Sequence, residues 1–367
     1  MVPYDLYRLL QCPTCGSRDL IVTDRGVACA ACGADYPRRD GYIDFMPRGL
    51  AFDYVSKYVS EEEELAHELD YRDLAPPLLA AGVRNRALRR LLDLRPTDIV
   101  LDSGCGNAKF AAWNASHVRL MVGVDPATLF ADDAVKTVAL IQGDARRLPF
   151  ADCTFDKAFS IDVLEHFPRD VIDAYLAETA RVLRPGGRFL VFSNTREPSR
   201  LQPLVDASRW LGRQFVRAGV YDFEREARRK SDHVKALATW EDVLDAVQRA
   251  GLRPVRVVFW NSVFTSFVEH VLMKLGEAFV GRGRKKGANH AGEASSDLAA
   301  PVGEGTAREI RARRRMRAHL QRRGLVYYAL LAVTLLMELD LWLFGRLRSG
   351  SYFVVVEKPG SAERKER

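Results

Sequence analysis

The stretch that decides the fold is residues 98–110, which read Asp-Ile-Val-Leu-Asp-Ser-Gly-Cys-Gly-Asn-Ala-Lys-Phe. A β-branched run ends at Asp102, and Gly104 and Gly106 follow before a segment that is compatible with a helix. Glycine lets the backbone turn tightly and approach a ligand closely. The pattern therefore predicts a strand that enters a glycine turn beneath a helix N-terminus.

A second acidic residue follows at the spacing that a nucleoside site requires. The next predicted strand, 119–124, ends at Asp125, about 20 residues beyond the turn, where a carboxylate can accept both hydroxyls of a ribose. A dinucleotide site usually has a third glycine where this chain has Ala108 or Lys109, and Asp102 would repel a pyrophosphate. A ligand with an ammonium group and a ribose but no phosphate, such as S-adenosylmethionine, fits these residues better.

Four further stretches follow in order, and together with the glycine turn they resemble a class I S-adenosylmethionine-dependent methyltransferase of the type 11 kind. They are Val-Gly-Val-Asp at 122–125, Gly-Asp-Ala at 143–145 with Leu-Pro-Phe at 148–150, Phe-Asp to Asp-Val-Leu-Glu-His at 155–166, and Leu-Arg-Pro-Gly-Gly with the following strand at 183–192. The resemblance spans residues 84–193. It implies an α/β fold with a Rossmann-like methyltransferase sheet.

The resemblance also implies a role for individual residues. One set of residues would hold the methionine part of S-adenosylmethionine, Asp125 would bind its ribose, and another set of residues would bind its adenine. The methionine set is Asp102, Gly104 and Gly106, and the adenine set is Asp144 and Ala145. Each acid by itself could instead be a helix cap or a solvated turn, since Asp is common at both places. Three acids in the family's order favour the binding role.

Four cysteines near the start of the chain predict a structural metal site. Cys12, Cys15, Cys29 and Cys32 form two Cys-x2-Cys pairs that are separated by thirteen residues. Such pairs can close a tetrahedron of thiolates around one Zn²⁺, which leaves no open position for catalysis. Residues 1–50 resemble a small Trm112-like zinc ribbon. The ribbon is either a structural cap or a docking surface for a substrate or partner.

The rest of the chain is expected to form one methyltransferase domain with two insertions. The domain is predicted to comprise 78–261 plus 351–358, with a helical insertion before the last strand. The additional predicted helices are 61–75, 84–94, 171–183 and 240–250, and the last two predicted strands are 254–260 and 351–357. In the family, these two strands pair as an antiparallel edge.

The first insertion, 195–235, follows the fifth strand of the predicted sheet. Open α/β sheets bind ligands at the carboxyl ends of their strands, so the apolar residues of this insertion suggest a lid over the substrate. An ordinary amphipathic cap is the alternative. His233 lies in this segment, and His166 and Asp162 follow the fourth strand. These three residues are the candidate catalytic bases for an oxygen or carbon acceptor.

The second insertion, 262–350, concentrates the basic charge of the chain. Residues 308–323 hold eight Arg and one Glu, a net charge of +7 that equals the formal charge of the whole protein. An amphipathic stretch (263–279) and a Gly-, Ala- and Ser-rich linker (281–306) precede it, and the apolar run 325–344 follows. Twenty apolar residues could span a bilayer. However, a single crossing could not return the chain to the same sheet.

A helix that lies on an anionic membrane surface fits the second insertion best, with helical packing on the body or in a homodimer, and a true span, as alternatives. The expected location is therefore cytoplasmic and peripheral, at the inner face of the cell membrane; no secretory signal pattern is present at Met1–Asp5. The favoured function is methylation of a hydrophobic or lipid-linked small molecule. The alternatives are an rRNA or tRNA methyltransferase, with nucleic acid as partner, and a non-catalytic scaffold that binds S-adenosylmethionine.

Overall fold

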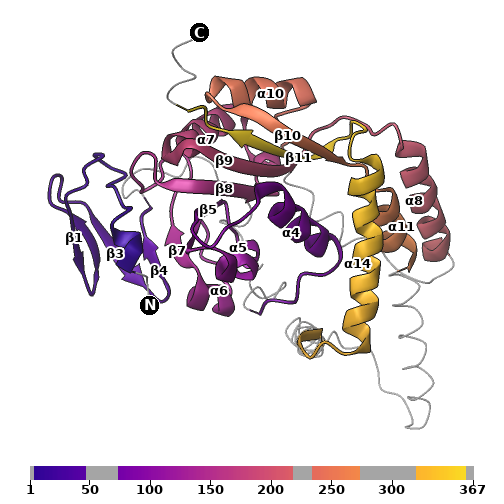
Figure 1. Cartoon of the computed structure of the whole chain (residues 1–367), viewed down its shortest axis with the longest axis horizontal. Helices are drawn as coiled ribbons and strands as arrows, with labels where there is room; N and C mark the ends of the chain where they lie inside the picture. Colours follow the sequence, from indigo (N-terminus) through magenta and orange to yellow (C-terminus); the bar gives the residue numbers. More distant parts are fainter. Residues whose placement is uncertain (1–3, 47–72, 218–233, 273–319, 361–367) are drawn as a thin grey trace, which may run out of the picture.

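The structure is a computed structural model that describes residues 4–46, 73–217, 234–272 and 320–360. His233 and the linker 281–306 lie outside these residues, and the predicted helix at 61–75 lies mainly outside them. Figure 1 shows a central sheet with helices on both faces, a small β-rich unit at one end and a group of helices at the other.

All described strands join one sheet. In chain order they are β1 (Leu20–Thr23), β2 (Gly26–Cys29), β3 (Asp35–Arg39), β4 (Tyr42–Asp44), β5 (Ile99–Ser103), β6 (Leu120–Asp125), β7 (Ala139–Gln142), β8 (Phe155–Ile161), β9 (Leu183–Asn194), β10 (Arg253–Trp260) and β11 (Ser351–Glu357). Their spatial order is β1-β2-β3-β4-β7-β6-β5-β8-β9-β11-β10. The strands from β7 to β9 are parallel, and β11 lies antiparallel between β9 and β10.

The central strands are buried on both faces because helices cover the sheet. The long helices are α4 (Leu79–Leu92), α7 (Arg169–Val182), α8 (Gln202–Arg217), α10 (Trp240–Arg249) and α14 (Leu325–Phe344). Shorter helical segments are α1 (Tyr4–Tyr7), α5 (Lys109–Asn114), η1 (Ala115–His117), α6 (Asp132–Thr137), η2 (Leu164–His166), α11 (Val263–Phe267) and η3 (Val268–Leu272). The run Ile99–Ser103 is buried at every position, as expected for a central parallel strand. These features confirm the predicted α/β fold with a helical insertion before the last strand.

The observed element boundaries lie within a few residues of the predicted ones. The helix predicted at 84–94 begins at Leu79 and ends at Leu92, where Asp93 adopts a left-handed conformation. The helix predicted at 240–250 begins after Thr239, which forms a reciprocal capping box with Asp242. The predicted strand 119–124 is β6, and it includes Asp125.

The N-terminal unit is continuous with the main sheet. Its strand β4 runs parallel to β7, so that Tyr42 lies opposite Leu140 and Asp44 lies opposite Gln142. The backbone nitrogen of Phe45 also donates to the carbonyl oxygen of Gln142 over 2.8 Å. The unit therefore covers a sheet edge that would otherwise present unpaired backbone groups.

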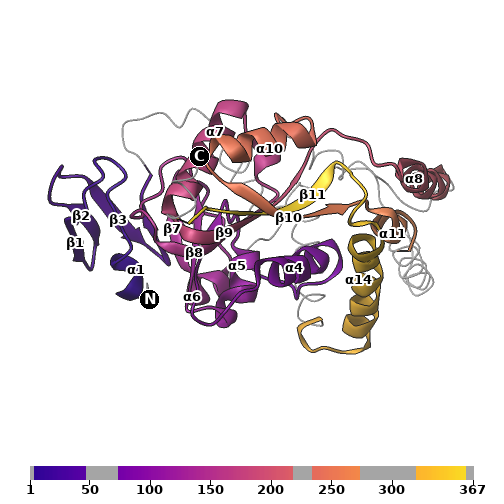
Figure 2. The same cartoon turned by 45° about the horizontal axis from the view of Figure 1, so that its top comes forward.

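Helices α8, α11 and α14 gather at the opposite end of the molecule, and both views place them together (Figures 1 and 2). Helix α8, the described part of the predicted lid, packs on α11, and Val205 is buried there. In contrast, Leu204 and Trp210 of α8 are exposed. Whether residues 195–235 close over a substrate remains a prediction.

Candidate functional site

The glycine turn lies at the carboxyl end of β5, as the sequence predicts. Gly104 and Gly106 have φ angles of +80° and +54°, a region that is unfavourable for other residues. A Cβ atom at Gly104 would lie 2.7 Å from Val163 Cγ2, whereas one at Gly106 would meet nothing within 4 Å. Gly104 is therefore needed for packing beneath the turn, and Gly106 leaves open space above it.

Ala108 occupies the position where the family often has a third glycine. Its φ angle is +59°, and it is the N-cap residue of α5. Ala108 thus adopts the backbone conformation that glycine would adopt, at a cost of about 1–2 kcal/mol for a residue with a Cβ atom. The turn keeps its shape despite this substitution.

Asp125 stabilises the turn from the neighbouring strand. One of its carboxylate oxygens accepts a hydrogen bond from the backbone nitrogen of Gly106 over 2.7 Å, and the other accepts from Ala127 N over 2.9 Å. The backbone nitrogens of Gly104 and Cys105 donate to Val124 O. The end of β6 therefore fixes the position of the glycine turn.

Asp102 is buried beneath this turn. Its residue is 2% exposed, and its Oδ2 atom has no hydrogen-bond partner among the described residues. Burial, together with the charge of Asp125, raises the pKa of the Asp102 carboxyl well above its ordinary value. A buried carboxyl oxygen without a partner is costly, and a ligand with an ammonium group would remove that cost.

Asp144 lies just beyond β7, but its carboxylate already has a partner. Arg146 forms an ion pair with it over 2.8 Å and also donates from its backbone nitrogen over 2.9 Å. Ala145, the adjacent residue of the predicted adenine site, is buried. The structure places Asp144 and Ala145 next to the end of β7, and an adenine amino group would share Asp144 with Arg146.

Two of the three candidate bases lie together after β8. Asp162 has a φ angle of +59° and forms an ion pair with Arg84 of α4 over 2.7 Å. The Arg84 guanidinium stacks on the rings of Phe192 and Trp260. His166 is half-buried at the end of η2, and His233 lies outside the described residues.

Glu165 was not among the predicted site residues, although it lies between two of them. It is 2% exposed, and it accepts hydrogen bonds from Ser193 Oγ over 2.6 Å and from Asn194 Nδ2 over 3.1 Å. Burial, and then the nearby Asp162 carboxylate, raises the pKa of Glu165 to about 7. The sequence gives no signal for this burial, because an acid at the end of a strand is usually solvated.

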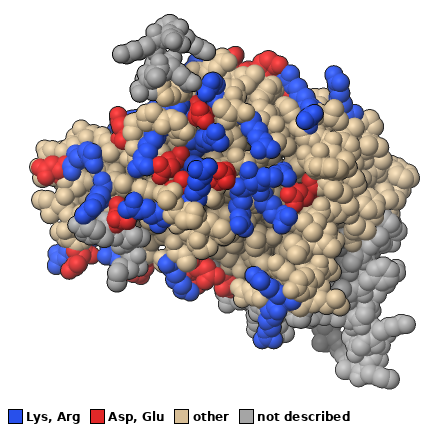
Figure 3. All heavy atoms as spheres, in the orientation of Figure 1, with Lys and Arg blue, Asp and Glu red and all other residues tan. Residues whose placement is uncertain are grey.

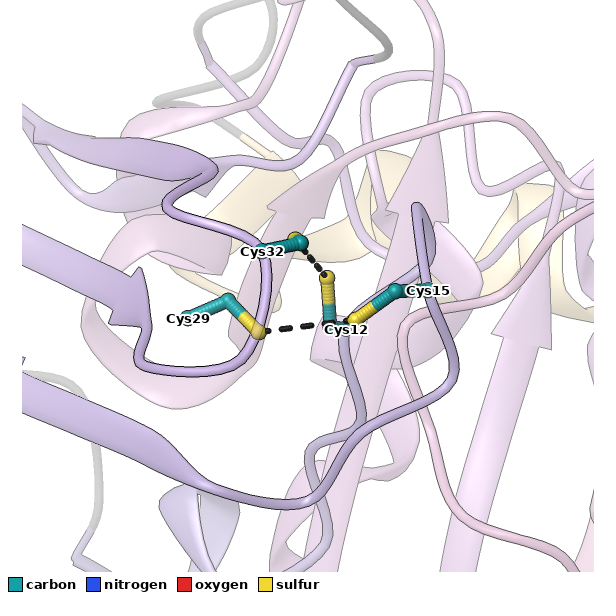
Figure 4. Close-up of side chains that lie close together, drawn as sticks. All are labelled: Cys12, Cys15, Cys29 and Cys32. Carbon is teal, nitrogen blue, oxygen red and sulfur yellow. Dashed lines mark hydrogen bonds between the residues drawn. The ribbon is translucent and has the colours of Figure 1, made fainter.

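The four predicted metal ligands converge in the N-terminal unit, as Figure 4 shows. Their Sγ atoms all lie within 4.8 Å of one another, and those of Cys12 and Cys32 are 3.7 Å apart and those of Cys15 and Cys29 3.6 Å apart. A tetrahedral Zn²⁺ with bonds of about 2.3 Å requires sulfurs roughly 3.8 Å apart, so the cluster fits this ion. The hydroxyl group of Tyr36 lies 3.1 Å from Cys12 Sγ.

Comparison with known proteins agrees with this geometry. Residues 101–191 match the family model described as "Methyltransferase domain". The chain is 36% identical over 128 residues to the methyltransferase GfsG of Streptomyces halstedii (31% of this chain, 45% of that relative), and 40% identical over 125 residues to a demethylmenaquinone methyltransferase of Mycolicibacterium vanbaalenii (32% and 53%). It is 26% identical over 200 residues to a ubiquinone biosynthesis O-methyltransferase of Cereibacter sphaeroides (53% and 69%). The chain spans about half the length of the first two relatives.

Proposed function

We propose that this chain, which carries an S-adenosylmethionine-dependent methyltransferase domain at residues 101–191, methylates a hydrophobic or lipid-linked small molecule. The observation that carries the proposal is the unpartnered, buried Oδ2 of Asp102 below an open glycine turn. The ammonium group of S-adenosylmethionine suits the site beside Asp102 better than a phosphate group does. When bound, S-adenosylmethionine supplies an electrophilic methyl group.

The residues around the turn would orient this cofactor. Asp102 would accept from its ammonium group, the Gly106 backbone would approach its methionine part, and Asp125 would accept from the ribose hydroxyls. Asp125 can do so while it holds Gly106, because a carboxylate offers about four acceptor positions. Methyl transfer is an in-line displacement, so the main tasks of the protein are alignment and the exclusion of water.

The acceptor would approach at the ends of β8 and β9, where aromatic rings and acids meet. The Arg84 guanidinium lies over the rings of Phe192 and Trp260 there, and it forms an ion pair with Asp162. Relatives named for demethylmenaquinone and ubiquinone biosynthesis support a hydrophobic acceptor. Asp162 and His166 remain the described candidates for a base, and His233 remains a third.

We also propose that the cysteine cluster holds a structural Zn²⁺ and that the N-terminal unit is a Trm112-like zinc ribbon. Four thiolates would fill the coordination sphere, so the metal would stabilise the fold and take no part in methyl transfer. Tyr36 would donate to one thiolate. Metal analysis of the purified protein should return about one zinc per chain, and a protein that folds fully without metal would contradict this assignment.

The experiment for the proposed activity uses the full chain and S-adenosylmethionine with a labelled methyl group. We expect label in the organic phase with a prenylated hydroquinone or a fatty acid as acceptor. The Asp102→Asn variant replaces the buried carboxyl group by an amide that cannot pair with an ammonium group, and it should lose most of this incorporation. Asp132→Asn, at an exposed acid on α6, should keep it. Label in RNA, or equal turnover by both variants, would overturn the proposal.

A further inference from the structure

Helix α14 presents two different faces, and one of them is bound to the methyltransferase domain. Thr334, Met337 and Leu341 are buried against the body. Thr334 Oγ1 accepts a hydrogen bond from Leu79 N over 2.7 Å, and Gly82 of α4 approaches the Thr334 side chain so closely that a Cβ atom would lie 2.9 Å from it. This face fixes α14 along α4.

The acidic residues of α14 also point to the body. Asp340 is fully buried and accepts hydrogen bonds from the backbone nitrogens of Phe264 and Thr265, each over 2.9 Å. Glu338 forms ion pairs with Arg86 over 2.6 Å and with Arg90 over 3.5 Å. Every acid of the helix is therefore satisfied by the protein, and none interrupts the outer face.

The outer face of α14 is an exposed apolar surface. Leu325 is 87% exposed, Tyr328 57% and Trp342 76%. Tyr328, Leu335 and Trp342 are spaced at two-turn intervals and lie on one side of the helix. We call this surface the α14 stripe, which consists of Leu325, Tyr328, Leu335, Trp342 and Leu343. In Figure 3, few charged side chains appear on the right, over α14 and α8.

Basic residues lie at both ends of the stripe. Arg322 and Arg323 precede the helix and are exposed, and six further arginines occur between 308 and 317 in the sequence. At the other end, exposed Arg346 and Arg200 line a surface hollow with Arg348, which forms ion pairs with Glu197 and Glu241. An apolar stripe with exposed arginines beyond both of its ends is complementary to the headgroups and upper acyl chains of an anionic bilayer.

The orientation of the helix relative to a bilayer follows from its attachments. Among the described residues, α14 alone has the length and composition of a membrane span. However, Asn261 Nδ2 donates to Phe344 O and Leu347 O at its C-terminal end, and β11 begins at Ser351 in the sheet. Crossing a bilayer would separate Asp340 from its partners and place its carboxyl group in hydrocarbon, which is unfavourable.

We propose that the α14 stripe binds the surface of an anionic lipid bilayer, with the helix axis parallel to the membrane plane. This inference deepens the proposed function, because it places the carboxyl end of β9 and the start of β11, which pair at Asn194 and Ser351, next to the phase that would contain a hydrophobic acceptor. Vesicle binding itself requires neither cofactor nor turnover. The two proposals can therefore fail separately.

The test is co-sedimentation of the full chain with vesicles of phosphatidylcholine and phosphatidylglycerol, and with vesicles of phosphatidylcholine alone. We expect binding to the anionic vesicles that weakens with salt. The double variant Leu325→Ser/Trp342→Ser should bind at least tenfold more weakly, since each substitution removes an apolar side chain that would be buried in the bilayer. The matched control is Ile21→Ser/Val22→Ser, which removes two exposed apolar side chains from β1 and should bind like the parent.

Three results would overturn the proposal. The parent could fail to sediment with anionic vesicles, or the double variant could bind as tightly as the parent. Alternatively, analytical ultracentrifugation could show a dimer that the double variant abolishes, which would assign the stripe to a second copy of this chain. Binding of S-adenosylhomocysteine, measured by calorimetry, should be equal in all variants and would show that each is folded.

Discussion

Asp125 accepts a hydrogen bond from the backbone nitrogen of Gly106 over 2.7 Å, so the acid at the end of β6 holds the glycine turn at the end of β5. The glycine turn and the proposed ribose-binding residue are therefore held in a fixed position relative to each other. An Asp125→Ala substitution removes this hydrogen bond, the one from Ala127 N and the proposed ribose contact. Hydrogen bonds to charged groups contribute about 1.5–3 kcal/mol.

We expect Asp125→Ala to weaken the binding of S-adenosylhomocysteine by roughly 10- to 100-fold, as measured by titration calorimetry. Asp132→Asn changes an exposed acid of α6 and should leave the Kd unchanged. An unaltered Kd in the Asp125 variant would place the ligand elsewhere on the chain.

The two turn glycines should respond differently to alanine. Gly104→Ala combines an unfavourable φ of +80° with a contact of 2.7 Å to Val163, so it should lower the free energy of unfolding by about 2–5 kcal/mol. Gly106→Ala introduces only the unfavourable φ angle and should lower the free energy of unfolding by about 1–2 kcal/mol. Its methyl group would enter the open space above the turn. Urea denaturation of both variants measures these losses of stability, and calorimetry measures ligand binding. Equal losses of stability in the two variants would contradict the prediction.

Glu165 should make stability depend on pH. Its pKa is raised in the fold from 4.5 to about 7, first by burial and then by Asp162. Between these values the folded chain binds more protons than the unfolded chain, so this contribution is complete below about pH 4.5 and is lost as the pH rises through 7. The loss is on the order of 3 kcal/mol.

The Glu165→Gln variant mimics the protonated carboxyl and should lack this dependence. Denaturation of parent and variant near pH 5 and near pH 8 should give a difference in stability that grows in favour of the variant at the higher pH. If the difference in the free energy of unfolding between parent and variant were the same at both pH values, Glu165 would not titrate in this range.

Removal of the proposed Zn²⁺ should weaken the main sheet at its edge. Since β4 pairs with β7, loss of the ribbon would leave the backbone groups of 139–142 unpaired on one side. We expect a chelator to lower the melting temperature and to speed hydrogen exchange at β7, with little change at β10. Unchanged exchange at β7 after the metal has been removed would show that the ribbon folds without it.

The parts of the fold that the sequence predicts are those with a local pattern. The apolar run at 99–101, the two glycines and the paired cysteines each constrain a few adjacent residues, and the structure places each as expected. The pairing of β4 with β7 has no such local pattern, because Tyr42 and Leu140 are far apart in the chain. Strand registers of this kind depend on tertiary contacts.

The candidate site was predictable to a similar extent. The spacing of Asp102 and Asp125 follows from strand–turn geometry, but the ion pair between Asp144 and Arg146 depends on side-chain conformation. The sequence also does not show which face of α14 is buried, because the helix is apolar on nearly every side. Periodicity cannot distinguish a buried Leu341 from an exposed Leu343.

The parallel pairing of β4 with β7 has a consequence for how the chain is made. During synthesis the N-terminal unit leaves the ribosome long before Leu140 does. The edge of β4 therefore stays unpaired until β7 has been made. A bound metal would keep the ribbon compact during this interval. Strand β7, which follows β5 and β6 in the chain, would then join the folded ribbon to the strands made before it.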